Sequence, residues 1–247
     1  MLPESALYYR NFDGTLHPLN SIDGMLPVLT RVKLDRWSCY MPRGAEPSNQ
    51  NILHSVSNIL KLTQDERTKK FLLKWEADFG RIESNRVRDE AIRAGNTIHA
   101  YLHSYLTDGE IKPVEETYKS YLNALNQLLP NFKDSLLSEQ LFVSFKYQYF
   151  GKIDQLGLYR GSLTLSDLKT ALKPKLSLSW VQDKLLQLAA YYIPIEALYP
   201  IEQAALIYLI SDGSYNEFLF TPKQMELYKE LWIERVSQVH ERMSSAA

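Results

Sequence analysis

Apolar residues recur along this chain with two different spacings, which divide it into helical and extended stretches. A helical spacing begins near residue 55 and continues to about residue 129, whereas apolar and polar residues alternate from Leu141 onward. A spacing of three to four residues places apolar side chains on one face of a helix, and alternation places them on one face of a strand. The chain is therefore predicted to form helices first and a sheet second.

Three helices are predicted before the sheet. Thr63 and Glu66 have the spacing of a capping box, and the first helix then ends before Gly80. The second is predicted over residues 82–106, and the third is predicted to begin after Pro113 and to end before Pro130. Each carries apolar positions that are expected to face inward: Phe71, Leu72, Trp75 and Phe79 in the first, and Val87, Ala91, Ile92, Ile98, Leu102 and Tyr105 in the second.

The second half of the chain has the pattern of a sheet with helices packed on it. Three strands with short connections are predicted at 141–149, 153–159 and 162–168, which is typical of an antiparallel meander. After them come a helix over 180–192, a hairpin of strands 204–210 and 215–220 across Asp212-Gly213, and a terminal helix opened by a Thr221–Gln224 capping box. This order predicts an α/β fold with a mixed central sheet flanked by helices, rather than a doubly wound Rossmann domain.

The first 50 residues differ from the rest of the chain. They hold five of the eleven prolines and three of the ten glycines, which predicts an irregular arm with short strands around Leu26–Leu34. The domain hypothesis is an N-terminal arm over 1–50 and one domain over 51–247. Within that domain, 51–135 is the helical part and 136–247 holds the catalytic sheet and helices.

Charge is unevenly distributed along the chain. The net charge is −1, which argues against binding to nucleic acid by bulk charge alone. Residues 140–190, however, carry seven basic and three acidic side chains, a surplus of 7 − 3 = +4. This segment is therefore the predicted anion-facing side of the molecule.

Other features exclude several classes of site. The single cysteine, Cys39, rules out an intramolecular disulfide and an all-cysteine zinc or iron–sulfur cluster. No Walker A sequence is present, so no nucleotide cofactor is expected. No apolar stretch reaches the roughly 18 residues of a membrane span, and residues 1–5 lack signal or transit features. The expectation is a monomer without membrane contact, in the cytoplasm of a bacterium or of a phage-infected cell.

One group of residues has the chemistry for phosphodiester hydrolysis. Asp167 and Lys169 are two apart on a predicted strand, so their side chains share a face, and Asp154 lies on the preceding strand. Two carboxylates and the carbonyl of Leu168 offer hard oxygen ligands for Mg²⁺, while the lysine can orient or deprotonate the attacking water. An isolated Asp-x-Lys triplet is more often a solvated ion pair, and the pattern alone leaves that alternative open.

Four motifs extend this group and give the chain a family resemblance. They are Gly95 to His99 (G-x-x-x-H), Gly151 to Asp154 (G-x-x-D), Asp167 to Thr170 (D-x-K-T) and Gln187 to Tyr191 (Q-x-x-x-Y). In this order they resemble the RecB-type branch of the PD-(D/E)XK nucleases, closest to the mitochondrial genome maintenance exonuclease group and its bacterial and phage relatives. The resemblance covers roughly residues 50–240 and implies a restriction-endonuclease-like core.

The resemblance also implies roles for individual residues. Asp154 and Asp167 would bind Mg²⁺ or Mn²⁺, with Lys169 as the catalytic lysine. His99 would act on the metal or the scissile phosphate, and Glu139, on the first strand, would be a further acidic ligand. The predicted DNA-contacting residues are Gln187, Tyr191, Lys173 and Lys175.

These roles lead to a functional hypothesis with named alternatives. The first is a metal-dependent DNA exonuclease that prefers single strands with a free end, with the helical segments arching over the site and aromatic residues such as Trp75, Tyr101 and Tyr105 stacking on bases. A structure-specific endonuclease on the same fold is the second. The third is a nucleic-acid-binding module without catalysis, and the presence of Asp154, Asp167 and Lys169 argues against it.

Overall fold

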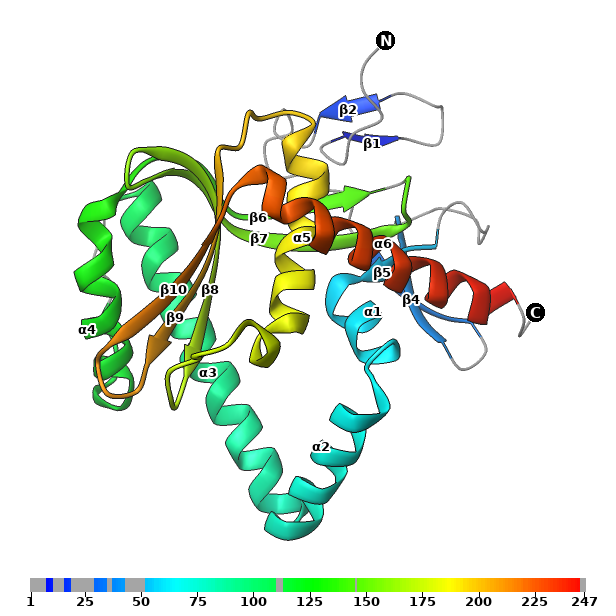
Figure 1. Ribbon diagram of the computed structural model, residues 1–247, viewed down its shortest axis with the longest axis horizontal. Coiled ribbons are helices and arrows are strands. Elements are labelled where there is room, and N and C mark those ends of the chain that lie inside the picture. Colours follow the sequence, from blue (N-terminus) through cyan, green and yellow to red (C-terminus); the bar gives the residue numbers. More distant parts are fainter. Residues whose placement is uncertain are drawn as a thin grey trace.

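The computed structural model describes the backbone of residues 8–10, 16–18, 29–34, 37–42, 52–109, 113–144 and 146–244. Within these ranges, the helices are α1 (Val56–Leu62), α2 (Glu66–Phe79), α3 (Arg81–Thr107), α4 (Lys119–Leu128), α5 (Gln182–Glu196) and α6 (Pro222–Ser244) (Figure 1). Short 3₁₀ helices lie at Glu116–Tyr118, Leu129–Asn131 and Leu178–Trp180. No helix in these ranges is both long enough and apolar enough to cross a membrane.

One mixed sheet forms the centre of the molecule. Its strands are β5 (His54–Ser55), β6 (Phe132–Ser144), β7 (Tyr149–Tyr159), β8 (Ser162–Ala171), β9 (Gln203–Ile210) and β10 (Tyr215–Phe220). They are ordered β10-β9-β8-β7-β5, with β6 also paired to β7. Pairing is antiparallel in β6–β7, β7–β8 and β9–β10, but parallel in β8–β9 and β5–β7. The predicted α/β class with a mixed central sheet and flanking helices is confirmed.

Of the predicted N-terminal arm, the structure describes only strands. They are β1 (Tyr8–Arg10) with β2 (Leu16–Pro18), and β3 (Leu29–Leu34) with β4 (Trp37–Pro42), each an antiparallel pair. The strand expected near Leu26–Leu34 is β3. Tyr40 of β4 exchanges two backbone hydrogen bonds with Leu53, which connects β4 to the beginning of the main sheet.

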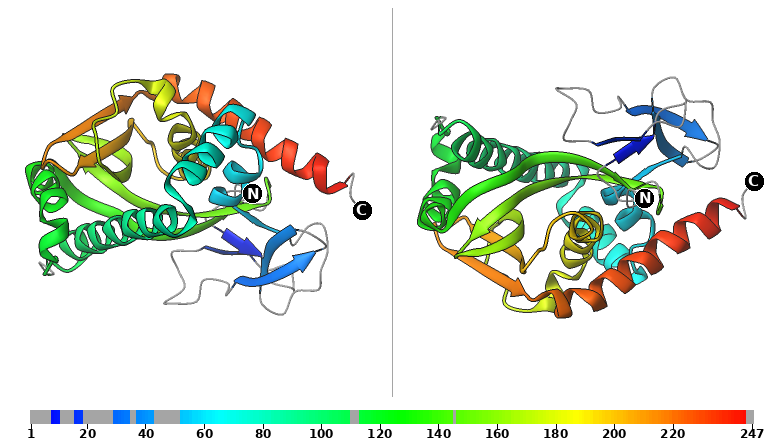
Figure 2. Two further views of the ribbon diagram at one scale, coloured as in Figure 1. Left: turned by 90° about the horizontal axis from the view of Figure 1, so that it is seen from below. Right: turned by 90° about the horizontal axis from the view of Figure 1, so that it is seen from above.

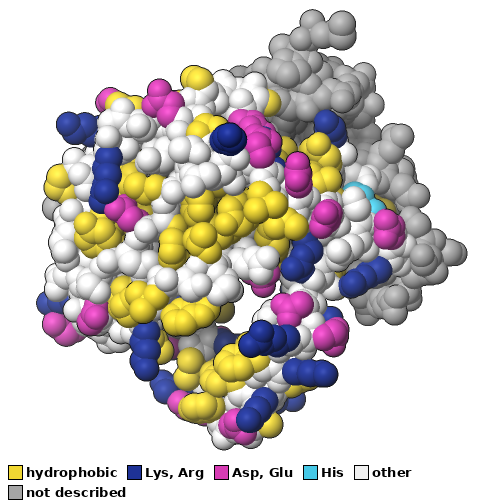
Figure 3. All heavy atoms as spheres, in the orientation of Figure 1, with side chains coloured by type: hydrophobic (Ala, Val, Ile, Leu, Met, Phe, Trp, Pro, Cys, Tyr) yellow, Lys and Arg dark blue, Asp and Glu magenta, His cyan; other side chains and the backbone are white. Residues whose placement is uncertain are grey.

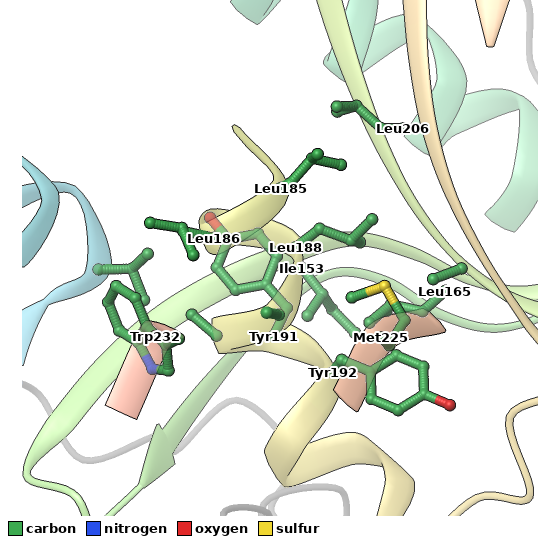
Figure 4. Close-up of a cluster of buried hydrophobic side chains, with 14 of the residues drawn as sticks. Ile153, Leu165, Leu185, Leu186, Leu188, Tyr191, Tyr192, Leu206, Met225 and Trp232 are labelled. Atoms are coloured by element: carbon green, nitrogen blue, oxygen red, sulfur yellow. The ribbon is translucent and has the colours of Figure 1, made fainter. Parts of the chain in front are cut away.

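Each face of the sheet is covered by its own group of helices (Figure 2). Helices α1, α5 and α6 pack on one face, where Trp232, Tyr192 and Leu188 are fully buried (Figure 4). Helices α3 and α4 pack on the other face through residues such as Leu125 and Ile98. Because both faces are covered, β9 is buried and almost entirely apolar from Ala204 to Ile210, as expected of a strand between two layers.

The first predicted helix differs from the structure at its beginning and in its burial. The Thr63–Glu66 capping box is wrong: Thr63 ends α1, and Asp65 caps α2 by accepting a hydrogen bond from the Thr68 amide at 2.8 Å. The predicted inward face is also wrong, because α2 buries no residue and Phe71 is 66% exposed. The apolar spacing indicated an amphipathic helix correctly, but no layer among the described parts of the chain covers its apolar face.

The second and third predicted helices are found as α3 and α4, although α4 begins only at Lys119. Ile98 and Leu102 of α3 are buried as expected, whereas Ala91 and Ile92, which were also expected to face inward, are exposed, Ile92 by 58%. The N-terminal half of α3 extends beyond the sheet together with α2 and forms a projecting helical hairpin (Figure 1). We call the segment Glu66–Ala91 the helical arm.

The first strand of the sheet begins nine residues earlier than the predicted Leu141, at Phe132. A register irregularity between Lys133 and Leu137 allows the strand to continue past a polar stretch that hides its alternation. The predicted end at Tyr149 is also wrong, because a turn lies there: Gln148 has a φ of 53° and β7 begins at Tyr149. The later elements, including the Thr221–Gln224 capping box, are found where predicted.

The stability of this fold is expected to depend on His54 in acid. His54 is buried, its Nε2 lies 2.9 Å from Met243 Sδ, and burial together with nearby His240 lowers its pKa to about 4. Since the unfolded pKa is about 6.5, this group contributes stability above pH 6.5 that is lost as the pH falls toward 4. Between pH 7 and pH 5 the loss from His54 amounts to about 2 kcal/mol. Urea unfolding of His54→Gln should show a pH dependence of the free energy of unfolding that is smaller by that amount. An unchanged pH dependence in His54→Gln would contradict this assignment.

Candidate active site

The candidate site forms where β7 and β8 separate. Their pairing ends at Gln155 and Ser166, so Asp154 stands at the first position beyond the ladder. The backbone amide of Leu168 donates to Asp154 Oδ2 at 2.7 Å, which satisfies a buried N–H that no longer faces a paired strand. The separation therefore fixes the Asp154 carboxylate at the point inside the sheet where β7 and β8 diverge.

His99 connects three oxygen ligands around this carboxylate. Its Nδ1 lies 3.1 Å from Glu139 Oε1 and 3.3 Å from Asp154 Oδ1, while its Nε2 lies 3.1 Å from the carbonyl oxygen of Leu168. Within the described ranges, one potential metal-binding group of three residues is found, with ligand atoms of His99, Glu139 and Asp154 within 4.8 Å of one another. The structure thus brings together four of the residues that the sequence predicted as ligands.

Local backbone geometry explains how Glu139 reaches this group. The register of β6 with β7 places Glu139 opposite Asp154, between the pairs Ser138–Gln155 and Gln140–Ile153. Glu139 has a φ of 51°, a conformation that costs a non-glycine residue free energy of order 1–3 kcal/mol. Such strain concentrates at functional sites, so this backbone geometry supports a role for the Glu139 carboxylate.

Lys169 and Asp167 of β8 form the second part of the site, next to Asp154. Lys169 Nζ lies 2.5 Å from Asp167 Oδ2 and 4.0 Å from Asp154 Oδ2. Asp167 is fully buried, and its Oδ1 has no hydrogen-bond partner among the described residues. Asp167 is also outside the group formed by His99, Glu139 and Asp154. In this structure Asp167 therefore holds the lysine.

The opposed charges shift the pKa values of the site. Burial alone would lower the pKa of His99, but Asp154 and Glu139 outweigh it and raise that pKa to about 10. Burial raises the pKa of Asp167 to about 6, with Lys169 opposing the shift. Burial also disfavours the charged Lys169, yet Asp167 and Asp154 raise its pKa above the usual range. The protein without a cation therefore carries an imidazolium and an ammonium among its carboxylates.

An open cavity of about 890 Å³ gives access to this group. It is lined by α1 on one side, by α3 on the other, and by β6, β7 and α5 at its base. Gln187 and Tyr191 of α5 line it, and Gln187 Nε2 donates to the Tyr191 hydroxyl at 2.6 Å.

Three other residues predicted to contact DNA do not line the cavity. Lys173 and Lys175 lie on the segment between β8 and α5, outside the cavity lining. Tyr101 is buried between α3 and the sheet, where it cannot stack on a base.

Two lining residues were missed in the sequence. Lys152 lies two residues before Asp154 within the G-x-x-D motif, and its ammonium is paired with Glu139. His103 lies one helical turn after His99, and its Nδ1 is 2.9 Å from Ser138 Oγ. The spacings of two on a strand and four on a helix place both residues on the faces of the predicted ligands, which is the signal that could have found them.

The ligand set suits a small divalent cation. Two carboxylates and a backbone carbonyl are hard oxygen donors of the kind that Mg²⁺ and Mn²⁺ prefer, and imidazole is an acceptable additional ligand for Mn²⁺. Glu139 and Asp154 are brought close together although their charges repel, and protonated His99 neutralises them from inside. A divalent cation can take over that role, so the residues present fit the predicted cofactor.

Comparison with known proteins gives a weak but consistent similarity. No protein-family model matches the chain. It is 25% identical over 210 residues to mouse mitochondrial genome maintenance exonuclease 1, covering 81% of this chain and 62% of that protein. It is 24% identical over 152 residues to the human protein of the same name, covering 59% of this chain and 44% of that protein. The chain therefore spans less than two thirds of the length of these relatives.

The solved structures with a similar fold have low TM-scores. The crystal structure of SSO0001 is 14% identical with a TM-score of 0.39 and covers 79% of either chain. A candidate exonuclease from Eubacterium rectale is 12% identical with a TM-score of 0.38, covering 81% of this chain and 85% of its own. The similarity to exonucleases therefore rests on the two mammalian sequences.

Gly151 is expected to be required for the shape of the site. A Cβ at this position would lie 2.8 Å from Tyr191 Cε1 and 2.9 Å from Phe142 Cε1, which is too close for either ring. Gly151→Ala should lower the free energy of unfolding by about 1–3 kcal/mol, as overpacking does in a filled core. Gly95→Ala is the matched control, because nothing lies nearer than Thr170 Oγ1 at 4.0 Å and alanine favours a helix. Urea titration of both variants tests this, and a Gly151→Ala protein as stable as the parent would contradict it.

Proposed function

We propose that the protein is a Mg²⁺- or Mn²⁺-dependent deoxyribonuclease, an exonuclease that prefers single-stranded DNA with a free end. The observation that carries this proposal is the convergence of Asp154, Glu139, His99 and the Leu168 carbonyl, with Lys169 beside them, at the base of an open cavity. Sequence similarity to two proteins named as exonucleases supports the same reaction.

Each group in the site has a proposed task in phosphodiester hydrolysis. Asp154, Glu139, His99 and the Leu168 carbonyl would hold a divalent cation. When bound there, the cation would supply Lewis-acid stabilisation of the phosphate and a lower pKa for the attacking water. The Lys169 ammonium, fixed by Asp167 at 2.5 Å, orients the water and neutralises charge that develops on the phosphate. Asp167, predicted as a second metal carboxylate, would join the ligand set only when Lys169 moves away from it.

The remaining predicted residues are proposed to contact the DNA. Gln187 and Tyr191 present an amide and a hydroxyl at the base of the cavity, where both can hydrogen-bond to a strand. Lys173 and Lys175 follow β8 outside the cavity and are proposed to contact phosphates of the DNA backbone. The monomeric state and the cytoplasmic setting remain predictions from the sequence.

The preference for a free single-stranded end is inferred from the path of the chain around the cavity. Val56 and Ser57 of α1 line one side, Asn96 and His99 of α3 line the other, and α2 connects the two helices. The helical arm, Glu66–Ala91, projects as a separate lobe beside the main body (Figure 3). A strand that passes between α1 and α3 is therefore bounded by continuous protein, which favours a flexible single strand entering by its end over a rigid duplex.

This proposal predicts metal-dependent cleavage of linear but not circular single-stranded DNA. The protein would be incubated with end-labelled linear DNA and with a circle of the same sequence, in Mg²⁺, Mn²⁺ or EDTA. Cleavage of the linear strand alone is expected, and its rate should fall about 10²–10⁴-fold in Lys169→Ala, because the group that acts on the water is lost.

Controls separate the alternative functions. Lys169→Met keeps the length of the apolar stem, and circular dichroism establishes that each variant is folded. Cutting of the circle would replace the exonuclease by an endonuclease. Binding of DNA without cleavage in either metal would overturn the enzyme and leave a binding module.

A further inference from the structure

Lys152 lies at the mouth of the cavity and is neutralised there by one carboxylate. Its side chain is 56% exposed and is paired with Glu139 Oε2, whereas Lys169 is 17% exposed and lies deep in the site. Among the ion pairs of the described residues, Glu139 is the only acidic partner of Lys152. The Lys152 side chain can therefore turn toward solvent or substrate while the backbone of β7 stays in place.

Both oxygens of Glu139 are engaged in the absence of a cation. Oε1 contacts His99 Nδ1 at 3.1 Å, and Oε2 contacts Lys152. A divalent cation that takes Glu139 as a ligand must compete with the Lys152 ammonium, since two positive charges on one carboxylate repel each other. Occupation of the site therefore favours release of Lys152 into the cavity.

We propose that Lys152 is a substrate-binding residue that exchanges Glu139 for a DNA phosphate when a divalent cation occupies the site. This inference rests on the proposed function, because it requires that the site binds a cation and a DNA strand. Its consequence is a positive coupling: the cation frees the lysine for the DNA, and the DNA removes the lysine that competes with the cation.

Two other basic side chains that line the cavity, Lys169 and His103, are less suited to this exchange. Lys169 stays with Asp167, a carboxylate outside the three-residue ligand group. His103 is hydrogen-bonded to the neutral Ser138 hydroxyl, so a cation does not release it. Lys152 is the one of these three whose nearest acidic partner, Glu139, belongs to that group. Asp154 of the group lies 4.0 Å from Lys169 Nζ, farther than Asp167 at 2.5 Å.

DNA binding measured with and without a cation tests the exchange. Anisotropy of a fluorescent oligothymidylate would be followed in Ca²⁺ and in EDTA, with a gel to establish that the strand stays intact. Lys152→Gln should weaken binding about fivefold in Ca²⁺ and less than about twofold in EDTA, where Glu139 already neutralises the lysine. The slope of log affinity against log salt should fall by about 0.7 in Ca²⁺ only.

Two variants serve as controls in the same assay. Lys152→Arg keeps the charge and should retain most of the affinity. Lys146→Gln removes an exposed charge near the β6–β7 turn, over the ring of Tyr147 and away from the cavity lining, and should leave the difference between Ca²⁺ and EDTA unchanged.

Metal affinity without DNA gives an independent readout. By calorimetry with Mn²⁺, Lys152→Gln should bind about two- to fivefold more tightly than the parent, because the competing ammonium is gone. This gain should disappear in the Glu139→Gln background, where there is no carboxylate to compete for.

The outcomes distinguish this inference from the function on which it rests. If the parent protein binds neither Mn²⁺ nor DNA, the proposed function fails. If it binds both and Lys152→Gln matches it in both assays, only the exchange is overturned. Equal weakening of DNA binding in Ca²⁺ and in EDTA would also overturn the exchange, because Lys152 would then be a fixed contact.

Discussion

The rest of this structure depends on the burial of carboxylates next to the basic side chains that neutralise them. Asp154 and Asp167 lie on neighbouring strands, and both are buried. An unpaired buried charge costs several kcal/mol, and two like charges at one site cost more. The structure offsets this cost with His99 from α3 and Lys169 from β8, which act as internal cations. The positions of α3 and β8 relative to β7 are constrained by this neutralisation.

The charged cluster contributes little net stability, since a buried ion pair seldom gains more than its desolvation costs. The stability of the domain comes instead from the apolar layers on the two faces of the sheet. Trp232 and Leu188 are buried on the side of α5 and α6, and Leu125 on the side of α4. These layers hold β7 and β8 rigidly enough to maintain the gap where they separate. The site is thus a group of polar residues, with a strained backbone at Glu139, where the β7–β8 pairing ends, and apolar packing supports it on both faces of the sheet.

The sequence predicted those parts of the site that depend on local geometry. The two-residue spacing placed Asp167 beside Lys169, because side chains two apart on a strand share a face. The position of His99 came from the family resemblance, because a single histidine in a helix has no local signature of its contacts. The contact of Glu139 with His99 depends on a left-handed backbone conformation, which no periodicity of side chains reveals. The pairing of Lys152 with Glu139 was not predicted for a related reason, because the two residues lie on different strands, β7 and β6.

The helical arm shows what apolar periodicity does and does not specify. Phe71 and Phe79 recur at helical spacing, and that spacing correctly indicates a helix. Whether another layer covers the helix depends on residues elsewhere in the chain.

The helical arm is held mainly by local contacts. Asp65 caps α2, and Arg88 of α3 pairs with Glu76 and lies over the Trp75 ring. Surface contacts of this kind contribute little free energy each, so the arm belongs to the least stable part of the domain. Under the proposed function, such low stability would let the arm change its position as a DNA strand enters beside α3, without disturbing the two apolar layers that fix the carboxylates.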